Sequence, residues 1–220
     1  MLATDLLSSI IPTVAPTESA STALELMDVF KVSHLPVVDG DEYIGLISDT
    51  IIYDLDNADR KICECHLHLP TPAVRGSQHI FEVIEMLSKT MLTTLPVVND
   101  NGQYLGVIGI SDLAFELSHL LSSENPGAII ELEMNVYDYS LSQIAQIVES
   151  NDSKVLSLHV RNTSPDTIVV TIKLNRTDVS GVIQTFERYN YNITAVHSVN
   201  EQYSSMLQDR LDSFIKFLNI

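Results

Sequence analysis

The segment HLPVVD, from His34 to Asp39, returns as TLPVVN, from Thr94 to Asn99, at an offset of 60 residues. A second matching pair follows at an offset of 61: YIGLIS, from Tyr43 to Ser48, and YLGVIG, from Tyr104 to Gly109. Self-similarity at a fixed period indicates a duplicated structural unit. The first 120 or so residues therefore predict two copies of one fold unit, each about 60 residues long.

Both copies carry the same pattern of apolar residues. The residues before each segment recur at i, i+3, i+4 and i+7, the spacing of one helical face: Ala20, Ala23, Leu24 and Met27, and Ile80, Val83, Ile84 and Leu87. The two β-branched runs that follow predict buried strands joined by a tight turn. A second helix is expected over 50–57 and over 112–121. The predicted order of elements in each unit is therefore strand, helix, strand, strand, helix.

These features together resemble the CBS-domain pair, or Bateman module. The resemblance covers residues 1–120 and rests on the tandem spacing, on apolar-Pro-Val-Val-Asp/Asn, and on Gly-apolar-apolar-Ser/Thr-x-x-Asp after it. It implies a mixed α/β fold, with CBS units at 1–60 and 61–122 packed around a pseudo-two-fold axis. It also implies adenosyl compounds in the clefts between the copies, and a sensor that shifts the state of a partner.

The C-terminal part, residues 128–220, has a different pattern after the polar, turn-forming segment 118–127. Alternating apolar residues predict strands over 130–136, 156–160, 170–174 and 193–198. Helical stripes follow the capping box Ser140–Gln143 and cover 179–189. The order βαββαβ is the ferredoxin-like arrangement. Apolar residues at helical spacing predict a further amphipathic helix over 203–218.

In topology this C-terminal part resembles the ACT domain, whose members often bind amino acids or other small molecules at subunit interfaces. The resemblance implies a dimerising domain or a second sensor. Its turn Tyr137–Ser140 lacks the glycine that amino-acid-binding ACT domains commonly have there. A CBS pair followed by an ACT-like domain is similar in order and length to the acetoin-utilisation accessory proteins.

The resemblance also implies where a ligand binds. A carboxylate at a helix start can accept two hydrogen bonds from a ribose diol beside N–H groups suited to phosphate. Asp112 matches the motif aspartate, Gly109 stands at its Ser/Thr position and Ser111 offers a nearby hydroxyl; in the first copy Ser48 keeps the hydroxyl but Ile51 replaces the aspartate. At most one nucleotide cleft per chain is expected. The candidate ligand-binding residues are Asp112, Ser111, Gly109, Thr94, Pro96, Val74, Arg75, Ser48 and His34.

Both motif residues also have purely structural interpretations. Asp112 could be a plain helix N-cap, and Ser48 a turn hydroxyl. These interpretations and the nucleotide interpretation stay open at this point.

The net charge of the chain limits the classes of ligand that it can bind. The chain has 12 Lys and Arg against 29 Asp and Glu, a net charge of −17, which repels nucleic acids and anionic membranes. Residues 1–119 contain five Lys and Arg against 17 Asp and Glu, a net charge of −12. Among these basic residues only Arg75, directly after the strand residue Val74, is well placed to meet a phosphate. AMP, adenosine or S-adenosylmethionine is therefore favoured over ATP, unless Mg²⁺ accompanies the ATP.

Two groups of residues suggest metal ions instead. Cys63, Cys65, His66 and His68 are possible soft-metal ligands. In an extended segment the cysteines face one side and the histidines the other, so core cysteines are the favoured interpretation. The acidic run Asp49, Asp54, Asp56 and Asp59 could hold Mg²⁺, but a solvated helix face is favoured. No cofactor is required.

The remaining patterns bound the class of protein. No nucleotide-binding loop or hydrolase motif is present, so we expect a regulatory protein and not an enzyme. Two cysteines make no disulfide framework, and no secretory signal or membrane-length apolar run occurs, which favours a cytoplasmic protein. The expected partners are a second copy in a homodimer, a regulated protein and a small molecule, with neither nucleic acid nor membrane. The alternatives are a degenerate scaffold for protein–protein interaction and a divalent-metal sensor.

Overall fold

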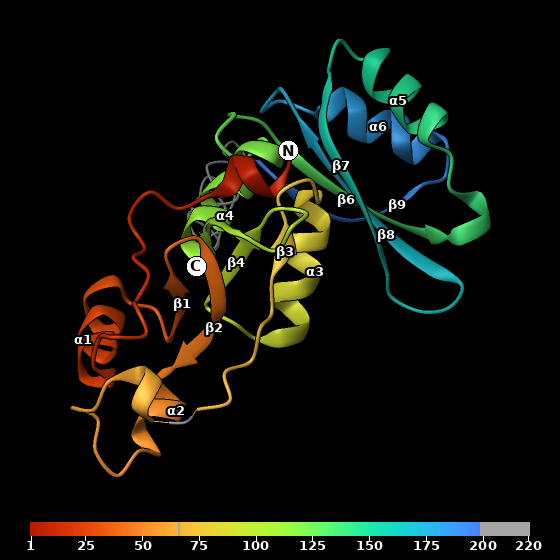
Figure 1. Cartoon of the computed structure of the whole chain (residues 1–220). Coiled ribbons are helices and arrows are strands. Elements are labelled where there is room, and N and C mark those ends of the chain that lie inside the picture. Colours follow the sequence, from red (N-terminus) through yellow and green to blue (C-terminus); the bar gives the residue numbers. More distant parts are fainter. Residues whose placement is uncertain (66, 199–220) are drawn as a thin grey trace, which may run out of the picture. The chain divides into compact units, whose positions relative to one another are not determined.

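The structure is a computed structural model that describes residues 1–65 and 67–198. The chain divides between Leu117 and Ser118 into two compact units (Figure 1). The N-terminal unit contains both copies of the repeat, and the C-terminal unit contains a separate four-stranded sheet. Among the described residues no helix is both long and apolar enough to cross a lipid bilayer.

The first copy consists of α1 (Ala20–Phe30), β1 (His34–Asp39), β2 (Glu42–Ser48) and the short α2 (Asp49–Tyr53). The Ser19 hydroxyl starts α1 by accepting the Thr22 N–H at 3.1 Å, as an N-cap residue does. β1 and β2 form an antiparallel hairpin. The strand expected before α1 is reduced to one parallel bridge between Val14 and Val37, and α2 ends before the expected residue 57.

The second copy repeats this plan with β3 (Val74–Arg75), α3 (Ile80–Thr90), β4 (Thr94–Val98), β5 (Tyr104–Gly109) and α4 (Ile110–Leu120). β3 runs parallel to β4, and β4 pairs antiparallel with β5. The order of strands and helices expected for a CBS unit is therefore confirmed in this copy. Each copy has its own core, built from the predicted helical stripe and the buried strands.

The segment that leads into each copy packs on the other copy. η1 (Ala3–Leu6) precedes the first copy, yet Ala3 and Leu6 are buried in the core of the second. η2 (Ile62–Glu64) precedes the second copy, yet Ile62 is buried in the core of the first. The hydrogen bonds match: the N–H of Ala3 donates to Gln78 O at 2.8 Å, and that of Ile62 to Glu18 O at 2.9 Å. Because each lead segment packs on the opposite copy, the two copies are related by a pseudo-two-fold axis and are held together by these contacts.

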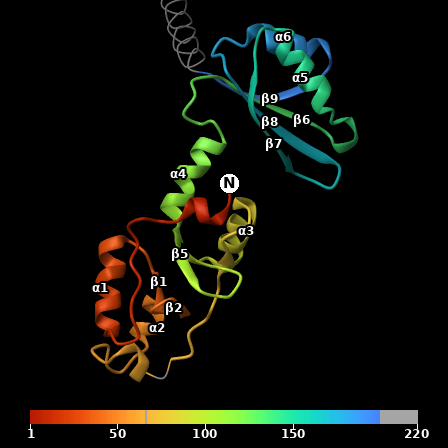
Figure 2. The ribbon, with the colours of Figure 1, turned by 45° about the horizontal axis from the view of Figure 1, so that its top comes forward.

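The C-terminal unit has the predicted βαββαβ order. Its elements are β6 (Ile129–Asn135), η3 (Val136–Asp138), α5 (Leu141–Glu149), β7 (Val155–Asn162), β8 (Thr167–Leu174), α6 (Ser180–Arg188) and β9 (Asn192–His197). The antiparallel sheet has the order β7-β8-β6-β9. Both helices cover one face of it (Figure 2), where their buried side chains meet those of the strands. This is the ferredoxin-like arrangement.

Two predictions for the C-terminal unit, the capping box at Ser140–Gln143 and the helix over 203–218, are not confirmed. The Ser140 hydroxyl accepts the Gln143 N–H at 3.4 Å and so caps α5. Gln143 does not complete a capping box, because its Oε1 accepts the Tyr191 hydroxyl at 2.9 Å. The amphipathic helix expected over 203–218 lies outside the described residues.

Candidate functional site

The two CBS copies meet where β1 and β4 begin. The N–H of Ser33 donates to Thr93 Oγ1 at 2.9 Å, and the Thr94 hydroxyl donates to the carbonyl of His34 at 3.0 Å. Thr94 is fully buried. Ser33 and His34 stand at the positions in the first copy that Thr93 and Thr94 occupy in the second. This contact therefore lies beside the pseudo-two-fold axis.

The imidazole of His34 accepts a hydrogen bond in this contact. Its Nδ1 accepts the N–H of Thr93 at 3.3 Å and lies 3.0 Å from Thr93 Oγ1. Because Nδ1 accepts, the proton of the imidazole is on Nε2. Burial lowers the pKa of His34, and the nearby carboxylate of Asp49 opposes that shift.

A second contact joins the copies at the far ends of the hairpins. The rings of Tyr43 and Tyr104 stack with centroids 6.4 Å apart, and burial raises the pKa of both phenols. The N–H of Tyr104 donates to the carbonyl of Asp41 at 2.9 Å. The two copies are thus fixed to one another at both ends of their strands.

The motif of the second copy comes together at the start of α4. Thr94 pairs with Gly109 across β4 and β5, and Asp112 lies in the first turn of the helix. A Cβ on Gly109 would lie 2.6 Å from Ile11 Cδ1 and 2.9 Å from Asp112 Oδ2. The glycine thus leaves room for both side chains. The structure brings together Thr94, Gly109 and Asp112, with His34 joined to them through Thr94.

The N-cap interpretation of Asp112 is wrong. α4 begins at Ile110, so Gly109 is at the N-cap position and Asp112 is the third residue of the helix. Ser111 is exposed in the same turn. Gly109 has no side chain that could cap the first N–H groups of α4.

The first copy differs at the equivalent place. The Ser48 hydroxyl accepts the N–H of Ile51 at 3.2 Å and lies 2.9 Å from Thr50 Oγ1, so it is the N-cap of α2. Ile51 packs against the core of the first copy. The hydroxyl of Ser48 therefore caps a helix, where the structural interpretation of this residue expected a turn hydroxyl.

Three further candidate residues lie on strands β3 and β4 of the second copy. Val74 is 1% exposed in the core of the second copy, and Pro96 is buried within β4. Arg75 is exposed but pairs with Val98, at the opposite end of β4 from Thr94. Four residues of strand span about 13 Å. The placement of Arg75 beside a ligand at Asp112 is therefore not supported by the strand register.

Sequence reasoning missed three residues of this site, namely Ser33, Thr93 and Ile11. Ser33 and Thr93 directly precede the repeated segments, and their equivalence by offset was the available signal. Ile11 gave none, because its contact with Gly109 depends on the path of the lead segment between the copies.

The cysteine–histidine segment is not extended at its cysteine end. Residues 62–64 form a 3₁₀ turn, and the Cys65 thiol contacts the carbonyl of Lys61 at 3.2 Å. Cys63 is exposed and Cys65 is only half-buried, so the interpretation of both residues as core cysteines is wrong. His66 lies outside the described residues, and His68 is exposed. Within residues 1–65 and 67–198, no three His, Cys, Asp or Glu side chains are grouped to hold a metal ion.

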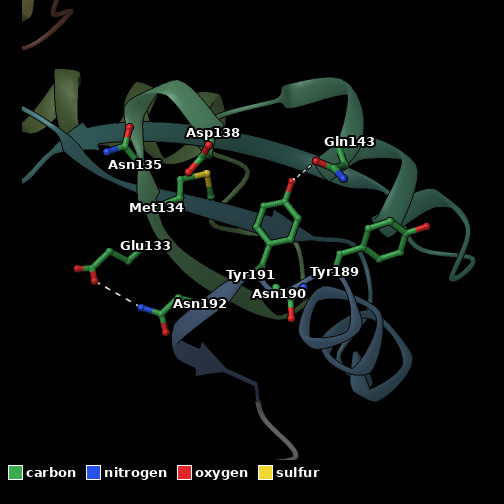
Figure 3. A pocket seen from close by; sticks show the side chains of 9 residues that line it. All are labelled: Glu133, Met134, Asn135, Asp138, Gln143, Tyr189, Asn190, Tyr191 and Asn192. Carbon is green, nitrogen blue, oxygen red and sulfur yellow. Dashed lines mark hydrogen bonds between the residues drawn. The ribbon is translucent and has the colours of Figure 1, made fainter.

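Each unit contains a cavity of similar volume. A cavity of about 300 Å³ lies between the end of α1 and α2, and its lining residues are Leu24, Met27, Asp28, Lys31, Val32, Ser33, Asp49 and Tyr53. The other, of about 290 Å³, lies in the C-terminal unit where β6 ends and the turn between α6 and β9 passes (Figure 3). Its lining residues are Glu133, Met134, Asn135, Asp138, Gln143, Tyr189, Asn190, Tyr191 and Asn192.

The lining of the second cavity is held in place by the unit's core. Tyr191 donates its hydroxyl to Gln143, and its ring packs edge-to-face on Phe186 with centroids 5.3 Å apart. The Nδ2 of Asn192 donates to Glu133 Oε1 at 3.4 Å. Four of the lining residues form the sequence Tyr-Asn-Tyr-Asn, 189–192, a signal that sequence reasoning did not use.

The chain was compared with known proteins. The family model of the CBS domain matches residues 3–56 and 68–119. An inosine-5'-monophosphate dehydrogenase of Korarchaeum cryptofilum is 21% identical over 186 residues, 83% of this chain and 39% of that protein. A homoserine O-acetyltransferase of Methanobrevibacter ruminantium is 32% identical over 124 residues, 54% of this chain and 24% of that protein. The chain thus spans about two fifths or less of the curated relatives it matches.

Solved structures resemble about half of the chain. A CBS domain pair/ACT domain protein from Thermotoga maritima is 19% identical with a TM-score of 0.49, covering 55% of this chain and 99% of that one. A putative acetoin utilization protein from Vibrio cholerae is 21% identical with a TM-score of 0.49, covering 56% of this chain and 95% of that one.

The family match coincides with the two copies defined by the repeat, the strand order and the exchanged lead segments. Residues 3–56 and 68–119 of this chain are a tandem pair of CBS domains.

Proposed function

We propose that the CBS pair is a ligand-responsive regulatory module that binds one adenosyl compound per chain at the start of α4. The observation that carries this proposal is the grouping of Thr94, Gly109 and Asp112 at that helix start, in a copy that keeps the motif aspartate. CBS pairs are regulatory modules that bind adenosyl compounds. The function is therefore binding, and no catalytic step is assigned to the pair.

The chemistry of the helix start suits a ribose and a phosphate. The Asp112 carboxylate can accept hydrogen bonds from both hydroxyls of a ribose diol. The first N–H groups of α4 favour an anion, and no side chain of Gly109 competes for them. The hydroxyl of Ser111 lies in the same turn and is exposed. The first copy lacks this combination, because Ser48 caps α2 and Ile51 replaces the aspartate.

The charge near this helix start favours a ligand of low negative charge. Thr94, Gly109, Ser111 and Asp112 include no basic residue, and burial lowers the pKa of His34, which favours its neutral form. Arg75 lies at the other end of β4. A triphosphate would gain little electrostatic compensation there. The proposed ligands are therefore AMP, adenosine or the cationic S-adenosylmethionine, with ATP weaker unless Mg²⁺ accompanies it.

A ligand at this place could act on the arrangement of the two copies. The hydrogen bonds from Ser33 to Thr93 and from Thr94 to His34 cross between the copies beside the ligand position. A ligand that binds one arrangement better than another shifts the equilibrium by its difference in affinity. The module would pass this shift to a regulated partner protein.

The test is calorimetric titration of the full chain with AMP, adenosine, S-adenosylmethionine, ATP and ATP with Mg²⁺. Replacing Asp112→Asn should weaken the ligand that binds by roughly 10-fold or more, because hydrogen bonds to a charged group are lost. The matched control is Asp100→Asn, an exposed carboxylate in the turn between β4 and β5, which should change nothing. If none of these compounds binds, or if both variants behave alike, the proposal fails and the scaffold interpretation takes its place.

A second copy of the chain is the other proposed partner. Large apolar side chains are exposed on or directly after helices of both copies, among them Tyr53 at 73%, Phe81 at 63% and Met91 at 82%. Exposed apolar surface of this kind favours association. Sedimentation velocity should show a dimer at micromolar concentration, and a monomer across the accessible concentrations would contradict it.

A further inference from the structure

The cavity of the C-terminal unit has a chemical character that is distinct from that of the CBS site. Its lining includes two carboxylates, Glu133 and Asp138, and no lysine or arginine. Two tyrosines and four side-chain amides complete the polar surface, with Met134 as the apolar contact. A concave site with a few convergent polar groups is the usual form of a small-molecule site.

The lining fixes the sign of charge that a ligand must bring. A positive charge near Glu133 and Asp138 is attracted by both carboxylates, whereas a negative charge meets no basic group of the lining. Tyrosine rings add attraction for cations through their π faces. One ring already has a cation near it: the guanidinium carbon of Arg188, a residue outside the lining, lies 5.8 Å from the ring centroid of Tyr189. The amides of Asn135, Asn190 and Asn192 can accept hydrogen bonds from an ammonium group.

The walls of the cavity are positioned before any ligand arrives. Tyr191 is held by Gln143 and by Phe186, a fully buried residue of the core. Glu133 is oriented by Asn192 across the β6–β9 pair. Figure 3 shows these side chains on the β6, α5 and α6–β9 segments that surround one space. A pre-formed lining lowers the ordering cost of binding.

We infer that this cavity binds a small organic cation that carries a primary ammonium group. The same charge selects against amino acids, which are the ligands that resemblance to ACT domains implies. The carboxylate of a zwitterionic amino acid would enter a lining with two carboxylates and no basic side chain. This inference does not depend on the adenosyl site, because all lining residues belong to the C-terminal unit.

The experiment compares four probes with the same four-carbon skeleton: 1,4-diaminobutane, 1,4-butanediol, 4-aminobutyrate and succinate. Each is titrated into the full-length, ¹⁵N-labelled chain at about 0.15 M salt, where exposed charges more than about 8 Å apart are largely screened. The diamine should shift the amide resonances of residues 133–138 and 189–192 and saturate. The diol and the zwitterion should bind more weakly, and succinate should not bind.

Two variants separate a site from general attraction to an acidic protein. Asp138→Asn removes one charge of the lining and should weaken diamine binding about fivefold or more. Asp152→Asn removes an exposed charge outside the cavity and should leave it unchanged. Because Asp138 is exposed, both variants should fold, which the amide spectrum itself reports. Equal binding of diamine and diol, equal weakening by both variants, or shifts spread over other acidic segments would overturn the inference.

Discussion

The two CBS copies share one backbone plan but start their second helices differently. In the first copy the hydroxyl of Ser48 caps α2, and Ile51 turns into the core. In the second copy Gly109 leaves the start of α4 without a side-chain cap, and Asp112 lies against it with Ile11. The duplicated fold thus caps one helix start with a side chain and leaves the other without such a cap, beside the carboxylate that we propose as the ligand contact. Substitutions at equivalent positions can test whether the two copies differ only at these helix starts or also in the stability of their cores.

The largest effect is expected where the copies should be alike. Leu35 and Leu95 are equivalent, and both are fully buried in their own cores. Leu35→Ala and Leu95→Ala should each lower the free energy of unfolding by about 3 kcal/mol, from lost burial and the cavity left behind. Urea denaturation of the two variants measures this. A cost that is several-fold larger in one copy would mean that the cores are not equivalent in energy.

A smaller and unequal effect is expected at the glycines of β2 and β5. A Cβ on Gly45 would lie 2.6 Å from Leu69 Cβ and 3.1 Å from the carbonyl oxygen of Pro70, which cannot move without the backbone. A Cβ on Gly106 would meet only the side-chain end of Leu7, at 3.0 Å. Both substitutions also strain the backbone, because φ is +159° at Gly45 and +155° at Gly106. Gly45→Ala adds overpacking against a carbonyl oxygen to this strain and should therefore cost about 1 kcal/mol or more beyond the cost of Gly106→Ala. If urea denaturation shows equal losses in the free energy of unfolding, the side chain of Leu7 cannot move to make room for the added Cβ.

The fold was largely predictable because its signals are local. The stripe of Ala20, Ala23, Leu24 and Met27 and its copy at 80–87 specify helices, and each helix appears there. The exchange of lead segments was not predictable in this way. Apolar residues such as Ala3, Leu6 and Ile62 indicate burial, but their pattern does not say in which of two similar cores they are buried.

The candidate site was predictable only as far as the motif reaches. Gly109 and Asp112 are three residues apart, so the helix itself brings them together. Arg75 was assigned to the site from its nearness to Val74, but the parallel register of β3 on β4 places it beside Val98. Register and the path of a loop come from long-range pairing, which a repeat in one sequence does not specify.

An effect of about 1 kcal/mol is expected from removing the cap that distinguishes the first copy. Ser48→Ala loses the hydroxyl that accepts the Ile51 N–H and should lower the free energy of unfolding by about 1 kcal/mol. The converse change, Gly109→Ser, should not gain this amount, because its Cβ would press on Ile11 Cδ1 and Asp112 Oδ2. Thermal denaturation of both variants is the measurement. Stabilisation by Gly109→Ser would show that Asp112 and Ile11 move away freely and that the helix start is not specialised.

The smallest effect is expected from the pH response of His34, the residue through which the copies touch beside their axis. Burial lowers its pKa below the ordinary value of 6.5, so the unfolded chain takes up this proton at a higher pH than the folded chain. The neutral form accepts the Thr93 N–H, and the protonated form cannot. The contribution of His34 to the free energy of unfolding should therefore be fully present above about pH 6.5 and decrease as the pH drops below that value. Urea denaturation between pH 7.5 and pH 5, compared with the variant His34→Gln, isolates this contribution, since a glutamine keeps an acceptor but does not titrate. If wild type and variant lose stability in parallel, the contact between the copies does not respond to pH, and the difference between the copies is confined to their helix starts.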